Sequence, residues 1–373
     1  MPTSDIVIIG GGIAGLSAAS ALSASAKVVV LESEKSIGYH ATGRSAAIYI
    51  KNYGNATLRA LNARSKAPLS TPILPVDAPI LTPRGELLIA EPTEMDVFEA
   101  YFQDSHGLER LTPTEAQNLV PILNTDRFSA AIYEPMAQDI DVDLLLTGYV
   151  RNARANGAEI VTDARVLTMQ HDGTSWTIET GQGKFTAKIV VNAAGAWGDH
   201  IARIAGVAPL GLQPLRRSAV LMALPDHLAC ENWPLFGSIS EQWYAKPMGG
   251  KLMISPADED PMEPQDAFPD DMTLAEGLWR FEQATHAPIV RPSHSWAGLR
   301  TFLPDRTPAA GFDASAEGFF WLVGQGGYGV QTSPGLSELA SSLILGHVPD
   351  LENAHVNALS PLRFSRKSSL APE

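Results

Sequence analysis

Residues 5–15 read DIVIIGGGIAG, an apolar run that leads directly into a cluster of glycines. The apolar run predicts a buried parallel strand, and the small residues that follow it suit a helix. Gly10, Gly12 and Gly15 occupy the three glycine positions of the dinucleotide fingerprint. These positions serve the tight turn, the close approach of backbone to a pyrophosphate, and the packing of helix on strand. The N–H groups near Ala14 would then face the phosphates of a bound dinucleotide.

A second predicted strand, residues 27–31, ends at Glu32 and Ser33. A carboxylate at this point of a nucleotide-binding fold accepts hydrogen bonds from a ribose diol. Strand, glycines, helix, strand and acid occur here in the expected order. This order favours a dinucleotide site over a tight strand–helix turn that binds no ligand.

The length and composition limit the class of protein. A chain of 373 residues with 45% hydrophobic and 18% charged residues is long enough for about two globular domains. A net charge of −14 argues against a nucleic-acid partner. Cys230 is the single cysteine and the nine histidines are scattered, so we expect a reducing compartment and no metal site. Glycines interrupt the longest uncharged run, 318–337, so we expect no transmembrane segment and a cytoplasmic protein. Peripheral contact with the inner membrane is the alternative.

The nucleotide-type segments are not contiguous along the chain. Between them lie stretches rich in proline and charge, which fit a second domain inserted twice into the first. We therefore predict an α/β fold with a Rossmann-like nucleotide-binding domain and a discontinuous α+β substrate domain with an antiparallel or mixed sheet. The first domain is assigned residues 1–47, 139–206 and 296–373, and the second is assigned residues 48–138 and 207–295.

Local signals predict three helix boundaries. A helix over 141–156 should end at Gly157, and the sequence Thr-Pro-Thr-Glu at 112–115 is a capping box that should start another helix. Ser333 and Pro334 predict the start of a third helix that runs through Leu345.

Five blocks of the chain together resemble a known family. In order, and over nearly the whole chain, the blocks resemble the D-amino-acid oxidase superfamily of FAD enzymes, and most of all its D-arginine dehydrogenase branch. The blocks are residues 5–32, 38–47 (GYHATGRSAA), 192–197 (NAAGAW), 296–300 (WAGLR) and 326–333 (GGYGVQTS).

The resemblance implies noncovalent FAD. The glycines of 326–329 would let the backbone approach the flavin ring, and the positive end of the helix that follows would lie near the ring. Arg44 would either donate to the cofactor or tie down its own loop by a salt bridge. The residues implied to contact FAD are Gly10, Gly12, Ala14, Gly15, Glu32, Ser33, Thr42, Gly43, Arg44, Ser45, Ala46, Ala47, Ile48, Val166, Ala194, Gly195, Trp197, Gly326, Gly327, Tyr328, Gly329, Val330 and Gln331.

The resemblance also implies a carboxylate clamp for the substrate. Arg217 and Arg300 match the two arginines that bind the substrate carboxylate in the family, and arginine suits this task because it binds in a bidentate manner. Tyr244 matches a donor to the same carboxylate, and Tyr53 matches a tyrosine on a loop that covers the pocket. Gly327 would offer its backbone carbonyl to the substrate amine. Each arginine could instead form a surface salt bridge, and each tyrosine could be structural.

Side-chain preference would depend on other positions. Glu86 matches the family acid that pairs with a cationic substrate side chain; alternatively, it caps a turn or pairs with Arg84. Ile48 and Ile50 stand where the D-arginine enzymes have a histidine and a threonine, which favours apolar side chains as well.

The implied activity is FAD-dependent oxidation of D-amino acids to imino acids by hydride transfer to flavin, followed by release of 2-oxo acids and ammonia. A quinone or another electron acceptor would reoxidise the flavin. The alternatives are a glycine- or sarcosine-type amine oxidase and an FAD-dependent 2-hydroxy-acid dehydrogenase. A nucleotide-binding module without turnover is a further alternative, against which the arginine pair argues.

Overall fold

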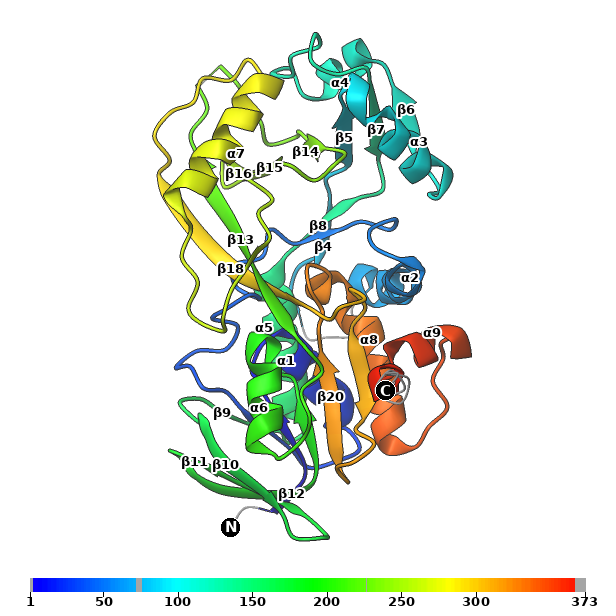
Figure 1. Ribbon diagram of the computed structural model, residues 1–373, viewed down its shortest axis with the longest axis vertical. Coiled ribbons are helices and arrows are strands. Elements are labelled where there is room, and N and C mark those ends of the chain that lie inside the picture. The colour runs from blue at the N-terminus through cyan, green and yellow to red at the C-terminus, as the bar shows by residue number, and fades with distance from the viewer. Residues whose placement is uncertain (1–2, 72–75, 226, 366–373) are drawn as a thin grey trace, which may run out of the picture.

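The protein has two lobes, each built on its own β-sheet (Figure 1). The computed structural model describes residues 3–71, 76–225 and 227–365. The strands of the first sheet come from residues 3–31, 159–192 and 309–323, and those of the second come from 86–134, 213–261 and 294–302. The predicted domain boundary at residue 296 lies inside a strand of the second sheet.

The first sheet has a parallel centre with antiparallel strands at its margins. The predicted strand at the N-terminus lies in the middle of the sheet and pairs in parallel with its neighbours on both sides. Its apolar run is explained by burial on both faces, since Ile6 and Ile8 belong to one core and Val7 and Ile9 to another. The strands are β1 (Thr3–Ile9), β2 (Val28–Leu31), β9 (Glu159–Val161), β10 (Val166–His171), β11 (Trp176–Thr180), β12 (Gly183–Asn192), β19 (Ala309–Phe312) and β20 (Phe319–Val323).

Helices cover both faces of this sheet. On one face α1 packs against α5 and α8, and on the other α6 contributes to the second core (Figure 1). The helices are α1 (Ile13–Leu22), α5 (Val142–Ala155), α6 (Gly198–Ile204) and α8 (Gly329–Leu345), with a short η2 (Gly195–Trp197) before α6.

The second sheet is mostly antiparallel, with one parallel pair between β5 and β14. Its two long strands β13 and β18 pair along nearly their whole length and extend toward the first lobe (Figure 1). The strands are β5 (Glu86–Ala90), β6 (Glu109–Leu111), β7 (Ala130–Glu134), β13 (Gln213–Met222), β14 (Leu235–Ser238), β15 (Tyr244–Met248), β16 (Lys251–Ser255), β17 (Asp260–Pro261) and β18 (His294–Phe302). The associated helices are η1 (Pro92–Glu94), α3 (Met95–Gln103), α4 (Pro113–Leu119) and α7 (Asp271–Ala284). The predicted α/β class with a mixed second sheet is confirmed.

A small sheet joins the lobes. It consists of β3 (Ile48–Tyr49), β4 (Leu81–Pro83) and β8 (Gln138–Ile140), which lie where the chain crosses from one lobe to the other. The adjacent α2 (Ala56–Ser70) packs on α8, and α9 (Asn353–Leu359) and α10 (Leu362–Ser365) follow α8 in the chain.

Two of the three predicted helix boundaries are confirmed and one is wrong. Asp141 caps α5 by accepting from the N–H of Leu144 at 2.8 Å, and the capping box of α4 is formed. The third helix does not start at Ser333, because α8 begins at Gly329 and contains Pro334. The Ser333 hydroxyl donates to the carbonyl oxygen of Val330 at 2.9 Å, which is the acceptor that the absent proline N–H would have used.

Candidate functional site

A cavity of ≈ 570 Å³ lies between the lobes. It extends from the loop after β2, past the glycine turn after β1, to the start of α8 and the strands β13 and β18. Each sheet therefore contributes to its walls. An elongated cavity at the ends of parallel strands is the usual binding place of a dinucleotide in this type of fold.

The glycine turn is shaped by close backbone contacts. Gly10 has φ 114°, and a Cβ atom there would lie 2.4 Å from the carbonyl oxygen of Ala193. A Cβ at Gly15 would lie 1.9 Å from the carbonyl oxygen of Gly10, so α1 can approach the turn only with glycine at this position. Gly10 thus serves the turn, and Gly15 serves the contact between helix and strand.

Two side chains satisfy backbone donors of this turn. The Thr42 hydroxyl accepts from the N–H of Ile13 at 3.0 Å, so a residue from a distant loop occupies one donor at the start of α1. The Glu32 carboxylate accepts from the N–H groups of Gly11 at 2.7 Å and Glu34 at 2.8 Å. Glu32 still lines the cavity, and a carboxylate has lone pairs left for further donors.

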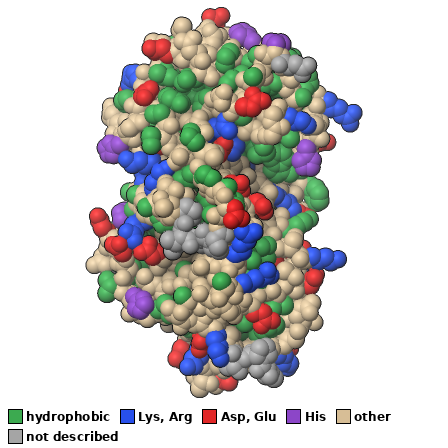
Figure 2. Space-filling view, turned by 180° about the vertical axis from the view of Figure 1, so that it is seen from behind, with side chains coloured by type: hydrophobic (Ala, Val, Ile, Leu, Met, Phe, Trp, Pro, Cys, Tyr) green, Lys and Arg blue, Asp and Glu red, His purple; other side chains and the backbone are tan. Residues whose placement is uncertain are grey.

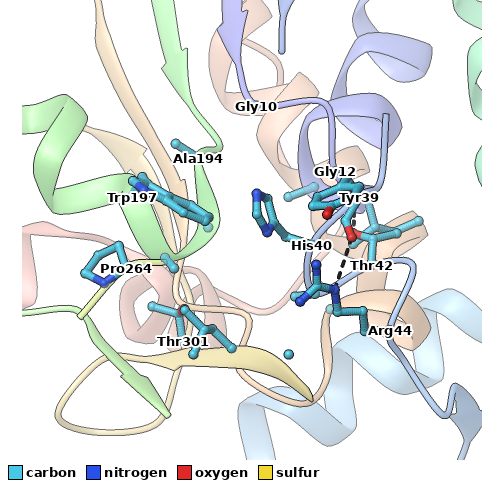
Figure 3. A pocket seen from close by; sticks show the side chains of 18 of the residues that line it. Gly10, Gly12, Tyr39, His40, Thr42, Arg44, Ala194, Trp197, Pro264 and Thr301 are labelled. Carbon is cyan, nitrogen blue, oxygen red and sulfur yellow. Dashed lines mark hydrogen bonds between the residues drawn. The ribbon is translucent and has the colours of Figure 1, made fainter. Parts of the chain in front are cut away.

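An aromatic wall stands beside the turn. Figure 3 shows the His40 ring between Trp197 and Tyr39, with Pro264 near Trp197. The centroid of the His40 ring lies 4.6 Å from that of Trp197 and 5.0 Å from that of Tyr39. His40 Nε2 lies 3.1 Å from the Glu34 carboxylate, which fixes the ring. The sequence analysis assigned no role to Tyr39 or His40, although both lie in one of the blocks that carried the resemblance.

The other end of the cavity lies at the start of α8. Gly326 has φ 53°, and a Cβ there would lie 2.2 Å from the Phe302 ring. A Cβ at Gly327 would lie 2.9 Å from a terminal nitrogen of Arg300. The bare backbone therefore leaves space for the guanidinium, and α8 begins directly after it, at Gly329. The positive end of this helix favours negative charge in the cavity.

Arg300 and Arg217 line this end of the cavity and differ in their partners. Arg217 donates to the backbone carbonyl of Asp258 at 2.8 Å and to Glu259 at 3.2 Å. Within the described ranges, no ion pair or hydrogen bond engages the Arg300 guanidinium, so its donors are available to a ligand. Burial lowers the pKa of the Arg300 guanidinium, but Tyr244, Tyr53 and nearby acidic groups raise it by more. The pKa therefore lies above its usual range, and the guanidinium is charged.

Tyr244 lies next to both arginines. The Arg217 guanidinium carbon is 5.9 Å from the centroid of its ring. Burial raises the pKa of Tyr244, but the positive charges of Arg300 and Arg217 outweigh this effect and leave it below its usual range. The neighbouring Arg216 points elsewhere, since it pairs with Asp258 and Asp260 on the other side of the strand.

An acidic group of side chains lies beyond the arginines. Glu86 is 8% exposed and stands opposite Glu134 on the neighbouring strand. Glu134 is already engaged by the Lys51 N–H at 2.9 Å and the Asn52 amide at 2.7 Å. Burial raises the pKa of Glu86 well above its usual range, and Glu134 and Glu241 add to this effect. No motif pointed to Glu241, which has φ 52° in the turn between β14 and β15.

Tyr53 and Tyr328 lie behind the arginines. Their rings lie 4.7 Å apart, and they pack with Phe302 and Leu58 in a small core. Burial raises the pKa of Tyr53, and the charge of Arg300 lowers it less strongly. Tyr53 is thus close to Arg300 while it forms part of a packed aromatic cluster.

The cavity brings together most of the predicted site residues. It is lined by Gly10, Gly12, Ala14, Glu32, Ser33, Thr42, Arg44, Ser45, Ala46, Val166, Ala194, Gly195, Trp197, Arg217, Tyr244, Arg300, Gly326, Gly327, Gly329 and Val330. The remaining predicted residues lie behind this lining, as far as the structure describes it: Gly15, Gly43, Ala47, Ile48, Tyr53, Glu86, Tyr328 and Gln331. Further lining residues that the sequence analysis did not single out include Arg165, His200, Met253, Glu263, Pro264, Gln265, Ala267 and Gln325.

Other features of the described residues can be stated briefly. Over these residues, no three His, Cys, Asp or Glu side chains are grouped so that they could hold a metal ion. The helices that the structure describes include none with the length and apolarity needed to cross a membrane. On the face seen in Figure 2, Lys and Arg side chains lie among Asp and Glu rather than in one basic patch.

Comparison with known proteins yields a family match over most of the chain. Residues 5–343 match the model of the DAO family, described as FAD dependent oxidoreductase. Human mitochondrial dimethylglycine dehydrogenase is 24% identical over 97% of this chain, and the chain spans 44% of that protein. Glycine oxidase from Geobacillus kaustophilus superposes with a TM-score of 0.83 at 21% identity, covering 97% of this chain and 99% of that one. L-proline dehydrogenase from P. horikoshii superposes with a TM-score of 0.84 at 23% identity, covering 98% and 99%.

Proposed function

Because the chain belongs to the DAO family of FAD-dependent oxidoreductases, we propose that it oxidises D-amino acids to imino acids, which hydrolyse to 2-oxo acids and ammonia. The family establishes FAD as the cofactor and an amine or amino acid as the type of donor. The choice of D-amino acids rests on the resemblance of the arginine pair, Tyr244, Tyr53 and Glu86 to residues of the D-arginine dehydrogenases.

The residues of the cavity fit FAD. The turn at Gly10 and Gly12 leaves backbone free of side chains where a pyrophosphate would lie, and Glu32 has acceptor capacity for a ribose. Gly326 and Gly327 line the other end of the cavity, where the isoalloxazine ring would lie. When bound, the flavin supplies a hydride acceptor for the substrate α-carbon.

The observation that carries the substrate assignment is the unpaired Arg300 beside the glycine loop. A half-buried guanidinium without an ion-pair partner favours binding of a carboxylate, which it can hold by two parallel hydrogen bonds. Arg217 and Tyr244 would complete the clamp on the same carboxylate. Fixing the carboxylate in this way orients the α-carbon for hydride transfer. The Gly327 carbonyl would accept from the substrate amine.

The acidic group supports tolerance of a cationic substrate side chain. Glu241 acts on the charge of both Arg300 and Glu86, so a substrate bound at Arg300 would lie near this acidic group. Ile50 is 4% exposed and lies beside this group, since the N–H of the next residue, Lys51, donates to Glu134 at 2.9 Å. We infer a broad preference that includes both cationic and apolar D-amino acids.

A second candidate is a glycine- or sarcosine-type amine donor. Its support is the similarity to proteins named for small or secondary amines, among them glycine oxidase and dimethylglycine dehydrogenase. Both candidates use the same carboxylate clamp. They differ in whether the pocket holds a substrate side chain.

Anaerobic reduction of the bound flavin tests these proposals. The holoenzyme is mixed with D-arginine, D-leucine, their L-enantiomers, glycine, sarcosine or a 2-hydroxy acid, and loss of flavin absorbance is followed. We expect rapid bleaching by both D-amino acids and little by the L-enantiomers. Reduction by glycine or sarcosine alone would select the second candidate. Reduction by a 2-hydroxy acid but by no amine would overturn both.

The Arg300→Ala variant tests the clamp itself. Loss of a desolvated charge-assisted contact should weaken substrate-driven reduction by about 2–5 kcal/mol while FAD stays bound. Unchanged affinity and rate would assign Arg300 a structural role. The electron acceptor, a quinone or another oxidant, and a cytoplasmic location with or without contact at the inner membrane, remain predictions from the sequence.

A further inference from the structure

A strap from the second lobe lies across the cofactor cavity. The strap, residues 262–268, joins β17 to α7, and Glu263, Pro264, Gln265 and Ala267 line the cavity. Its first residue, Met262, donates its N–H to the carbonyl of Pro214 at 3.0 Å. Ala267 is 4% exposed and packs in a core with Ala297 and Leu299. Both ends of the strap are therefore anchored on the second lobe.

The middle of the strap is held by the opposite lobe. The Arg44 guanidinium donates to the Asp266 carboxylate at 2.5 Å, to the Ala267 carbonyl at 3.0 Å and to the Ala297 carbonyl at 2.9 Å. The other carboxylate oxygen of Asp266 accepts from the Tyr39 hydroxyl at 3.1 Å. The loop that carries Tyr39 and Arg44 also lines the cavity, as Figure 3 shows for these two side chains.

This arrangement changes the role expected for Arg44. Its remaining donor, Nε, binds the backbone carbonyl of Tyr39 at 3.3 Å, so nearly all of its hydrogen-bonding capacity goes to the protein. The Arg44 side chain is 16% exposed and that of Asp266 is 40% exposed. Such a pair is strong enough to hold two segments together and accessible enough to be screened by salt.

We propose that Arg44 and Asp266, with Tyr39, form a clasp that closes the strap over the bound FAD and slows its release. Arg44 is in this view a positioning residue that retains the cofactor by joining the two lobes, and it does not donate to the phosphates. The cofactor enters or leaves when the clasp opens and the strap moves away from the loop of Tyr39–Arg44. The arginine hydrogen bond holds the pKa of Asp266 below its usual range, which keeps the clasp charged at neutral pH.

The test measures FAD release rather than turnover. Holoenzyme is diluted, and the recovery of free FAD fluorescence gives the release rate for the unmodified protein and for Asp266→Asn, Tyr39→Phe and Glu99→Gln. Glu99→Gln is the control, because it breaks an ion pair with Arg110 in the second lobe, and the Glu99 side chain is as exposed as that of Asp266, 42% against 40%. We expect release to be about 3- to 10-fold faster for Asp266→Asn and about 2-fold faster for Tyr39→Phe. Glu99→Gln should release FAD at the unmodified rate.

Salt provides the second readout. Raising NaCl to about 0.5 M should accelerate release more in the unmodified protein than in Asp266→Asn, because the variant has no ion pair left to screen. Unchanged or slower release from Asp266→Asn would overturn the clasp and return Arg44 to a phosphate contact. Equal acceleration by Asp266→Asn and Glu99→Gln, or equal salt sensitivity of variant and unmodified protein, would also overturn it. Tyr39→Phe keeps the test decisive if Asp266→Asn folds poorly.

Discussion

The two arginines of the cavity are prepared differently for a carboxylate. Arg217 is held in place by Asp258 and Glu259, so its remaining donors are oriented before a ligand arrives. Arg300 is positioned by the space that Gly327 leaves for it. Arg217 is thus rigidly held and Arg300 is unpaired, and the Tyr244 hydroxyl lies close to both. Together they form a pre-organised site for a single negative charge.

Tyr244 should make carboxylate binding sensitive to alkaline pH. Its pKa lies below 10.0, since the two arginines favour the phenolate. As the pH rises through this lowered pKa, the hydroxyl donor becomes a negative charge beside the ligand, and binding weakens. We expect the Kd of a simple carboxylate without an amine, measured by perturbation of the flavin spectrum, to rise at a pH where an ordinary tyrosine is still neutral. Tyr244→Phe should bind more weakly at neutral pH and lack this alkaline limb. An identical limb in the variant would contradict the assignment.

Glu86 should distinguish cationic from apolar substrates. A cationic side chain favours the ionised form of Glu86 against the burial that raises its pKa, and glutamine cannot ionise. The substitution should therefore lower kcat/KM for D-arginine roughly 30-fold and change kcat/KM for D-leucine little. Steady-state kinetics of Glu86→Gln with both substrates measure the difference. Glu109→Gln is the control, because Glu109 is an exposed acid on β6, which is separated from β5 by β7. Equal losses for the two substrates would show that Glu86 does not read side-chain charge.

At the scale of elements, α1 and α8 both begin at the cavity, but different contacts satisfy the backbone near their first turns. The first N–H of α1 is satisfied by Thr42 from a separate loop. The start of α8 at Gly329 was missed because Ser333 and Pro334 form a typical N-terminal pair. Inside the helix, a side-chain hydroxyl takes the place of the N–H that Pro334 lacks. The Ser65 hydroxyl accepts from the N–H of Gly335 at 3.1 Å. Local propensity therefore gave the wrong boundary where tertiary contacts satisfy the backbone.

The contact between α1 and the glycine turn should be intolerant of a single methyl group. In Gly15→Ala the new Cβ would lie 1.9 Å from the Gly10 carbonyl oxygen, so the helix must shift away from the turn. We expect a loss of about 1–3 kcal/mol in stability and a lower FAD content after purification. Thermal unfolding and the ratio of flavin to protein absorbance measure both effects. Gly181→Ala is the control, because its Cβ would have no neighbour closer than 3.9 Å. A fully loaded Gly15→Ala protein would contradict the packing argument.

At the scale of the whole molecule, a feature could be predicted from the sequence when the residues that form it lie close together in the chain. The strand, turn and acid of 5–32 lie close together in the chain, so their pattern was readable. The clasp of Arg44 with Asp266 and the pairing of Glu86 with Glu134 join segments that have no local pattern linking them. Gly327 and Arg300 were assigned through family resemblance, and their proximity emerges only from the contact of the loop before α8 with β18, where the Gly326 N–H donates to the Thr301 carbonyl at 2.9 Å. Long-range contacts of this kind decide which predicted residues line the cavity.

A buried lysine ties the lobes together near the cavity. Lys246 on β15 is 6% exposed, and its ammonium donates to the Ala46 carbonyl at 2.6 Å and to the Asp139 carboxylate at 2.8 Å. Asp139 on β8 also accepts from Arg84 at 2.6 Å. One ammonium thus links the second sheet, the small sheet and the loop that lines the cofactor cavity.

Removing this ammonium should weaken the joint between the lobes. In Lys246→Met the Ala46 carbonyl loses a buried donor and Asp139 keeps only Arg84, so we expect a loss of about 3 kcal/mol in stability. The melting temperature of the holoenzyme should fall accordingly, and FAD should be released at a lower temperature than in the unmodified protein. Lys251→Met on the adjacent β16 is the matched control, because its ammonium makes an exposed contact with Ser293 at 3.0 Å. If both variants melt at the same temperature, the Lys246 network does not hold the lobes together, and their association rests on the small sheet of β3, β4 and β8 and on apolar packing.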